Sequence, residues 1–171
     1  GRLPVLEAAR RLQSALDVEA VTKRFYSRYA DQHASLLSQI EGIADERDRR
    51  WYASVILNRL MFVWFLQKKL FLDGGDANYL PRQLEVSRQR GRDRFFGEFL
   101  NALFFEAFAK PEADRSADAR ALTGRIPYLN GGLFLHHKLE LDEHHAPRLG
   151  KTLRIPDAAF DGVFKVFSDF S

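Results

Sequence analysis

One long apolar segment constrains the fold more than any other feature of this sequence. Between Val55 and Leu66 the residues are apolar on every side of a helix, and only Asn58 and Arg59 interrupt them. A helix that is apolar all round lies inside a bundle rather than on its surface. The sequence therefore predicts a helix over residues 45–70, most buried from about residue 51 onward.

This segment is too short to cross a membrane, because a membrane-spanning helix needs roughly 20 consecutive apolar residues. We also find no leader in which a charged stretch precedes an apolar one. We therefore expect no membrane partner, no export and a cytoplasmic location. The first residue is Gly1 rather than Met, and we expect the chain to be a fragment of a larger protein.

Most of the remaining sequence also shows helical spacing, with apolar residues recurring at steps of three and four. Asp17 is expected to cap a second helix and so to separate it from the first. The other predicted helices are residues 5–16, 17–42, 79–91, 95–108 and a last helix that begins at Pro156.

A short alternating pattern in the last third of the chain predicts β structure. Leu139 and Leu141 alternate with charged residues, and Leu153 and Ile155 are the candidates to pair with them across a polar loop. The predicted fold is mainly α, a multi-helix bundle with one short β-hairpin between Leu133 and Ile155.

The composition fits one domain with an aromatic core. The chain has 171 residues, of which 46% are hydrophobic and 29% charged, with fifteen Phe and no Cys. Such a chain can bury a sizeable core, but it can form neither disulfides nor thiolate metal sites. We predict a single helical domain over residues 1–171, in which residues 1–16 are a candidate tail of an upstream element.

Local basic clusters have to carry any argument for DNA binding, because the formal net charge is only +3. Five arginines lie within a short span around Gly91, and such a cluster can neutralise DNA phosphates. The competing interpretation is a solvated helix face. The candidate contacts to the DNA backbone are Arg82, Arg88, Arg90, Arg92 and Arg94.

A second group of polar residues is predicted to be structural. Asn58, Arg59 and Gln67 lie on the most apolar helix, where polar groups are expected to be buried and to need partners. The expected partners are acidic residues or backbone carbonyls of a turn with positive backbone angles. The residues of that turn are Asn130, Gly131 and Gly132.

Two histidine pairs raise the question of a metal site. His136-His137 and His144-His145 bracket three carboxylates, and imidazole with carboxylate can bind zinc. Neighbouring side chains in a strand point to opposite faces, however, so one pair cannot chelate from a regular strand. We favour a surface hairpin and expect no metal.

Three segments together carry a resemblance to a known family. They are residues 58–69 (NRLMFVWFLQKK), residues 126–134 (IPYLNGGLF) and Ile155-Pro156-Asp157 with Phe160 following. In order and spacing they resemble type IIG restriction-modification enzymes and related large adenine-specific DNA methyltransferases. The resemblance implies that this chain is the helical region that precedes the methyltransferase domain of an enzyme with a role in phage defence.

The catalytic and cofactor-binding motifs of that family are missing from this sequence. There is no Asn-Pro-Pro-Tyr for a flipped adenine, no Gly-rich loop for S-adenosylmethionine and no nuclease Glu-x-Lys after an Asp. We expect no catalytic residue and no cofactor in the fragment, with S-adenosylmethionine in the adjacent domain of a parent methyltransferase, with or without endonuclease activity.

The predicted function is therefore that of a non-catalytic helical connector that contacts the DNA backbone. Its expected partners are double-stranded DNA and the adjacent methyltransferase domain. The alternative is a purely structural or protein-interaction module without DNA contact.

Overall fold

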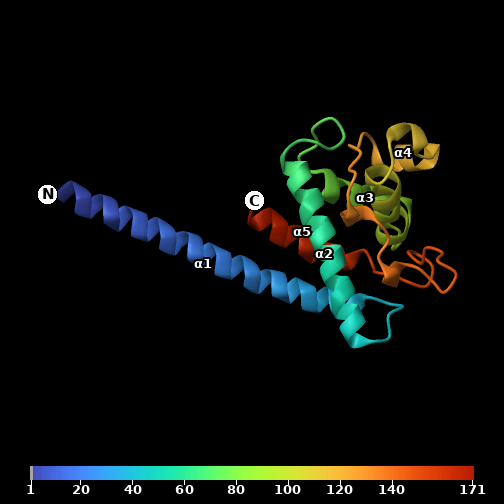
Figure 1. The fold of residues 1–171 in the computed structure, drawn as a ribbon, viewed down its shortest axis with the longest axis horizontal. Helices are drawn as coiled ribbons and strands as arrows, with labels where there is room; N and C mark the ends of the chain where they lie inside the picture. The colour runs from blue at the N-terminus through green and yellow to red at the C-terminus, as the bar shows by residue number, and fades with distance from the viewer. Residues whose placement is uncertain (1) are drawn as a thin grey trace.

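The computed structural model describes residues 2–171, with side chains from residue 4 onward, and it is mainly helical (Figure 1). This confirms the prediction of a mainly helical fold. The α-helices are α1 (Arg2–Gln39), α2 (Glu46–Lys68), α3 (Tyr79–Arg90), α4 (Ala117–Thr123) and α5 (Ala158–Asp169). Two π-helical stretches, η1 (Phe95–Leu100) and η2 (Leu103–Phe108), follow α3, and the three 3-10 turns are η3 (Glu112–Asp114), η4 (Gly132–Phe134) and η5 (Lys138–Glu140).

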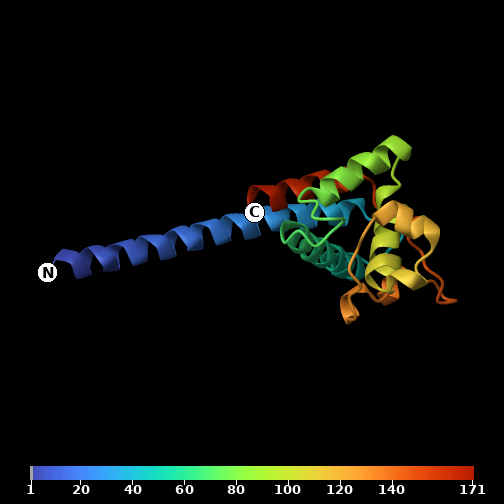
Figure 2. The ribbon, with the colours of Figure 1, turned by 90° about the horizontal axis from the view of Figure 1, so that it is seen from above.

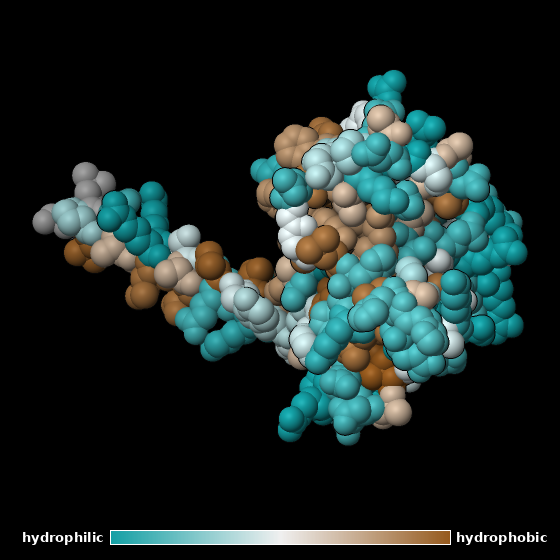
Figure 3. Space-filling view, turned by 45° about the vertical axis from the view of Figure 1, so that its right-hand side comes forward, coloured by the Kyte–Doolittle hydropathy of each residue, from teal (hydrophilic) through white to brown (hydrophobic). Residues whose placement is uncertain are grey.

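The first helix is longer than the sequence predicts. α1 is continuous through Asp17, so the predicted break there is wrong. The Asp17 side chain accepts a hydrogen bond from Gln13 one turn earlier, at 3.0 Å, instead of capping a new helix. The first part of α1 projects away from the body, and hydrophobic side chains lie along it (Figures 2 and 3). The later part of α1 reaches the core through Tyr29 and Leu36, and Ile40, directly after the helix, is also buried.

Helix α2 passes through the body and contacts α1, α3 and α5. Its predicted bounds are confirmed, because the Asp45 side chain accepts a hydrogen bond from the Asp48 N–H at 2.9 Å and caps the helix. Its C-terminal end turns away through Leu70, which has a φ of 63°. None of the described helices is long and apolar enough to cross a membrane.

One face of α2 departs from the prediction of a helix covered on all sides. Val55 and Phe62 are only half-buried, and Phe65 is 53% exposed. The opposite face is fully buried and includes Ile56, Leu60 and other core residues. The body therefore covers one side of a helix that is apolar all round.

The predicted β-hairpin is wrong, since no strand forms within residues 2–171. In its place, the His137 side chain accepts a hydrogen bond from the Leu139 N–H while the Glu140 carboxylate accepts one from the His137 N–H. This reciprocal cap closes the turn η5. The spacing of Leu139 and Leu141 therefore belongs to a tight turn rather than to a strand.

Contacts between aromatic rings run through the core. The rings of Phe95 and Phe99 lie 5.2 Å apart between centroids, and those of Phe108 and Phe134 lie 4.5 Å apart. These rings connect the π-helical segment to α5 and to the segment around η4. Aromatic packing therefore joins parts of the chain that lie far apart in the sequence.

Candidate nucleic-acid interface and its supporting core

Arg59 is the largest side chain that the fold buries completely, with 2% of its surface exposed. Two of its nitrogens bind the Glu140 carboxylate in a bidentate pair, at 2.8 and 2.9 Å. The guanidinium also donates to the backbone carbonyl of Leu133 at 3.0 Å and to that of Leu135 at 2.9 Å. Arg59 thereby attaches the whole segment from residue 133 to residue 140 to α2.

Glu140 is equally buried and has two further donors. The Tyr52 hydroxyl donates to one carboxylate oxygen at 2.8 Å, and the His137 N–H donates to the other at 2.7 Å. Burial raises the pKa of Tyr52 well above its ordinary value, and the neighbouring Glu140 charge raises it further. Tyr52 thus stays protonated and acts as a donor in an enclosed network.

The other polar residues of the apolar helix have different surroundings. Gln67 is fully buried, and its side-chain oxygen accepts the Leu80 N–H at 2.7 Å near the start of α3. Asn58 is exposed, so the expectation that it is buried is wrong. Asn58 is exposed because it lies on the face of α2 that the rest of the protein leaves uncovered.

The Asn-Gly-Gly segment also differs from the prediction of a turn with positive backbone angles. Asn130, Gly131 and Gly132 are exposed, and neither glycine has a positive φ. Gly131 has an extended φ of −171°. The segment is held instead by the buried ring of Phe134, whose neighbours Leu133 and Leu135 are bonded to Arg59 through their carbonyls.

Three of the five candidate arginines are already engaged with carboxylates of the same chain. Arg82 binds Asp73 and Asp76, Arg88 binds Asp161 through two hydrogen bonds at 2.6 and 2.9 Å, and Arg90 pairs with Glu98. Hydrogen bonding to Asp161 raises the pKa of Arg88. A phosphate would have to displace a carboxylate at each of these positions.

The remaining two arginines differ from these three. The Arg92 side chain is 95% exposed and lies 3.5 Å from the carboxylate of its neighbour Asp93. Arg94 is exposed and has no ion pair within the described part of the chain. Both precede η1, at the place where residues 148–156 pass close by.

Two glycines allow these segments to meet. A Cβ on Gly97 would lie 2.5 Å from the Cα of Gly150, and a Cβ on Gly150 would lie 2.9 Å from the Cα of Gly97. Gly150 also has a φ of 76°, which side chains rarely allow. This close approach brings Lys151 and Arg154 to the same region as Arg92.

Two aspartates hold the other side of this junction. The Asp157 N–H donates to the Asp93 carboxylate and the Asp93 N–H donates to the Asp157 carboxylate, each at 2.9 Å. The second Asp157 oxygen accepts the Phe95 N–H at 3.2 Å. Asp157, in the Ile-Pro-Asp motif, is therefore a buried structural residue that orients the start of η1.

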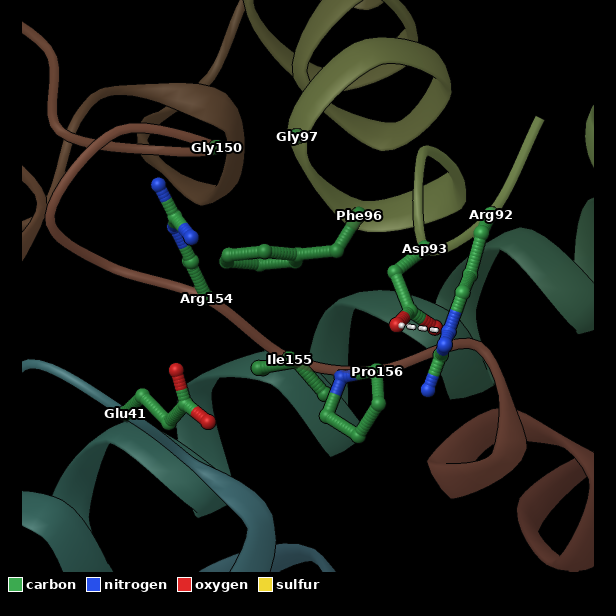
Figure 4. Close-up of a pocket in the computed structure, with 9 residues that line it drawn as sticks. All are labelled: Glu41, Arg92, Asp93, Phe96, Gly97, Gly150, Arg154, Ile155 and Pro156. Carbon is green, nitrogen blue, oxygen red and sulfur yellow. Dashed lines mark ion pairs between the residues drawn. The ribbon is translucent and has the colours of Figure 1, made fainter.

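A pocket of about 430 Å³ lies at this junction (Figure 4). Arg92 and Arg154 stand at opposite ends of it, with Phe96 between them and Glu41 below. The carboxylates of Glu41 and Asp93 line the pocket as well. Arg94 and Lys151 follow the lining residues Asp93 and Gly150 in the sequence, and we name the four cations Arg92, Arg94, Lys151 and Arg154 the basic rim. Sequence reasoning missed the last two, because only the short run RLGKTLR at residues 148–154 points to them.

Comparison with known protein families identifies the family of this chain. Residues 51–159 match the family model described as a domain of unknown function, DUF7814. The chain belongs to this family. The matched DUF7814 region includes Arg59, Glu140 and the basic rim, whereas α1 lies before it.

One relative is similar to about half of the chain. A protein of Methanocaldococcus jannaschii, whose name describes it as a type II restriction enzyme and methyltransferase, is 31% identical to this chain over 97 residues. The match covers 52% of this chain and only 8% of that protein. No solved structure matches the chain.

The histidine pairs of the DUF7814 region do not come together. The His136 ring stacks on Phe105 at 3.8 Å between centroids, and the His137 ring meets Trp51 edge-on at 4.4 Å. No group of three or more His, Asp or Glu side chains in the described residues is placed to hold a metal ion. Burial lowers the pKa of both His136 and His137.

We expect this lowered pKa to make the folded state less stable in mild acid. The unfolded chain takes up protons on histidine as the pH falls below its ordinary pKa of 6.5, whereas folded His136 resists protonation. Stability is therefore lost as the pH falls from about 6.5 toward the folded pKa. Replacing His136→Gln should reduce the fall in melting temperature between pH 7 and pH 5.5.

The matched control is His144→Gln, because the His144 side chain is 82% exposed. This variant should follow the unmodified chain at both pH values. Equal pH dependence of the melting temperature in all three proteins would contradict the role of His136.

Proposed function

We propose that this chain is a non-catalytic helical module of a restriction-modification protein and that its basic rim contacts the backbone of double-stranded DNA. The observation that carries the proposal is that two distant segments meet at one pocket, which Arg92 and Arg154 line and which Arg94 and Lys151 adjoin in the sequence. None of the four has a carboxylate within 3.5 Å in the described residues, apart from the Asp93 contact of Arg92 at that distance.

The chemistry of the basic rim suits phosphate oxygens. The basic rim has four cations, whereas the pocket lining has two carboxylates, Glu41 and Asp93. Guanidinium groups bind phosphate in a bidentate manner and carry no sequence information by themselves. The arginines of α3 are weaker candidates, because Arg82, Arg88 and Arg90 would first have to leave their carboxylates.

The name of the Methanocaldococcus jannaschii relative supports a place within a restriction-modification protein. We propose further that the parent is of the single-chain type IIG kind, in which an adjacent adenine-specific methyltransferase domain binds S-adenosylmethionine. The module itself is assigned no catalytic residue. Its buried cluster of ionisable groups, Arg59, Glu140 and Tyr52, is enclosed in the core.

A salt series tests the DNA contact. We expect weak binding of the chain to two unrelated duplexes with similar affinity, measured by fluorescence anisotropy, and a steep fall in affinity with salt. Replacing Arg92 and Arg154 together by Ala should lower the slope of log affinity against log salt by about one for each lost phosphate contact.

The control variant is Arg88→Ala, which removes an arginine bound to Asp161 and should leave the slope nearly unchanged. Melting curves show whether each variant is folded. An unchanged slope in the double variant would refute the assignment to the basic rim. No binding by the unmodified chain at low salt would favour a protein-interaction module instead.

A further inference from the structure

The guanidinium of Arg148 joins three separate parts of the chain. It donates to the carbonyl oxygen of Leu139 at 2.9 Å, to the Thr152 hydroxyl at 3.0 Å and to the carbonyl oxygen of Gly42. These acceptors lie in the turn η5, in the loop that carries half of the basic rim, and in the connection between α1 and α2. All three acceptors are uncharged, which sets Arg148 apart from the arginines that are bound by carboxylates.

The main chain of Arg148 closes the loop in which it lies. Its carbonyl oxygen accepts the N–H groups of Lys151 at 2.9 Å and of Leu153 at 3.1 Å, and the Gly150 N–H donates to the Leu153 carbonyl at 2.9 Å. The Arg154 side chain is fixed in turn, because its Nε donates to the Lys151 carbonyl at 2.9 Å. This compact turn leaves the side chains of Lys151 and Arg154 exposed.

The turn is held against the connection between α1 and α2 at two consecutive residues. Glu41 exchanges two backbone hydrogen bonds with Arg154, each at 2.9 Å, and the next residue, Gly42, accepts from the Arg148 side chain. The fit is close, since a Cβ on Gly42 would collide with the Thr152 carbonyl oxygen. Because Glu41 and Arg154 both line the pocket, this junction sets where the loop meets the basic rim (Figure 4).

We propose that Arg148 is the positioning residue of the basic rim, holding Lys151 and Arg154 in place for phosphate without binding DNA itself. This inference rests on the proposed DNA contact of the basic rim. A loop that is ordered in advance loses little further conformational freedom on binding, so its cations bind phosphate at a lower entropic cost. Arginine suits this role, since its planar fork reaches acceptors in several directions, whereas lysine presents a single point charge.

The alternative is that Arg148 acts only through its charge, as a further cation beside the rim. Arg148→Lys separates the two roles, because it keeps the charge and loses the hydrogen bonds to three segments. Positioning predicts that this variant lowers the slope of log DNA affinity against log salt by about two, one for each misplaced cation. A slope equal to that of the unmodified chain would overturn the proposal in favour of the charge alone.

Two combined variants test whether the loss passes through the loop. Replacing Lys151 and Arg154 by Ala in the Arg148→Lys chain should lower the slope no further, because those cations are already misplaced. Adding Arg92→Ala instead should lower the slope by about one more, since Arg92 lies on the other segment. A further loss of about two from the Lys151 and Arg154 substitutions would contradict the positioning role.

Arg115→Lys is the matched control. Arg115 is 5% exposed and donates to the Lys110 carbonyl at 2.9 Å, outside the pocket lining. Its replacement also removes an arginine that binds a backbone carbonyl, but it should leave the salt slope unchanged. A loss equal to that of Arg148→Lys would show that both changes act only by destabilising the fold.

Hydrogen exchange gives a readout that needs no DNA. Arg148→Lys should speed the exchange of the Leu153 and Arg154 amides by about tenfold or more, whereas amides in the middle of α2 should exchange as in the unmodified chain. If the unmodified chain binds no DNA at low salt, the proposed function fails, and the exchange rates still decide whether Arg148 holds the loop. Unchanged exchange at Leu153 and Arg154 would overturn the role of Arg148 whatever the DNA result.

Discussion

Replacing Arg59→Ala is expected to lower the free energy of unfolding by about 3–5 kcal/mol, because it leaves the Glu140 charge buried without its partner. The same change removes the donors to the carbonyls of Leu133 and Leu135, which are held by no other side chain in the described residues. Urea titration followed by circular dichroism measures the effect.

The control is Arg50→Ala on the same helix. Arg50 pairs with Glu46 at the surface, where both side chains are at least 60% exposed, so the expected loss is only about 0–1 kcal/mol. A double-mutant cycle with Glu140→Ala should give a coupling energy of about 0.5–3 kcal/mol. Equal effects of Arg59→Ala and Arg50→Ala would show that the buried pair contributes no more than a surface pair.

The second large effect is expected for Phe134→Ala, at about 3–5 kcal/mol of unfolding free energy, since it empties a packed aromatic site. Phe134 is 3% exposed, and its ring meets those of Phe108, Phe104 and Phe62 at centroid distances of 4.5, 5.7 and 6.0 Å. The same urea titration measures this loss.

Leu135→Ala is the control for this variant, because Leu135 follows Phe134 directly and is 66% exposed. Its effect should stay within about 0.5 kcal/mol. A small loss for Phe134→Ala would mean that the surrounding rings close over the gap. Phe134 and Arg59 hold the same segment, so their combined substitution should cost less than the two separate losses added together.

Several helices could be predicted from local signals in the sequence. Local signals predicted α2 well: Asp45 caps its first turn, and residues 73–76 (DGGD) follow its end. The Phe-rich helix and the last helix were predicted from apolar spacing in the same way. Each of these signals acts over a few residues along the chain, so it can be read without knowing the rest of the fold.

The sequence alone could not show which arginines pair with carboxylates and which are free. All five near Gly91 look alike, but Arg88 binds Asp161, which lies 73 residues away, and Arg90 is bound by Glu98. Arg92 and Arg154 line the same pocket because Gly97 and Gly150 let two segments approach closely. Whether an arginine is free to bind a phosphate depends on which distant carboxylate pairs with it. The spacing of residues along the sequence does not contain that information.

Helix content, the position of α2 and the aromatic character of the core were therefore determined by the sequence alone, because spacing and caps are local. The tertiary structure decided the rest. It turned the expected hairpin into the turn η5, because Glu140 binds Arg59 across 81 residues. It also left one face of α2 uncovered, because α1, α3 and α5 pack against other parts of that helix.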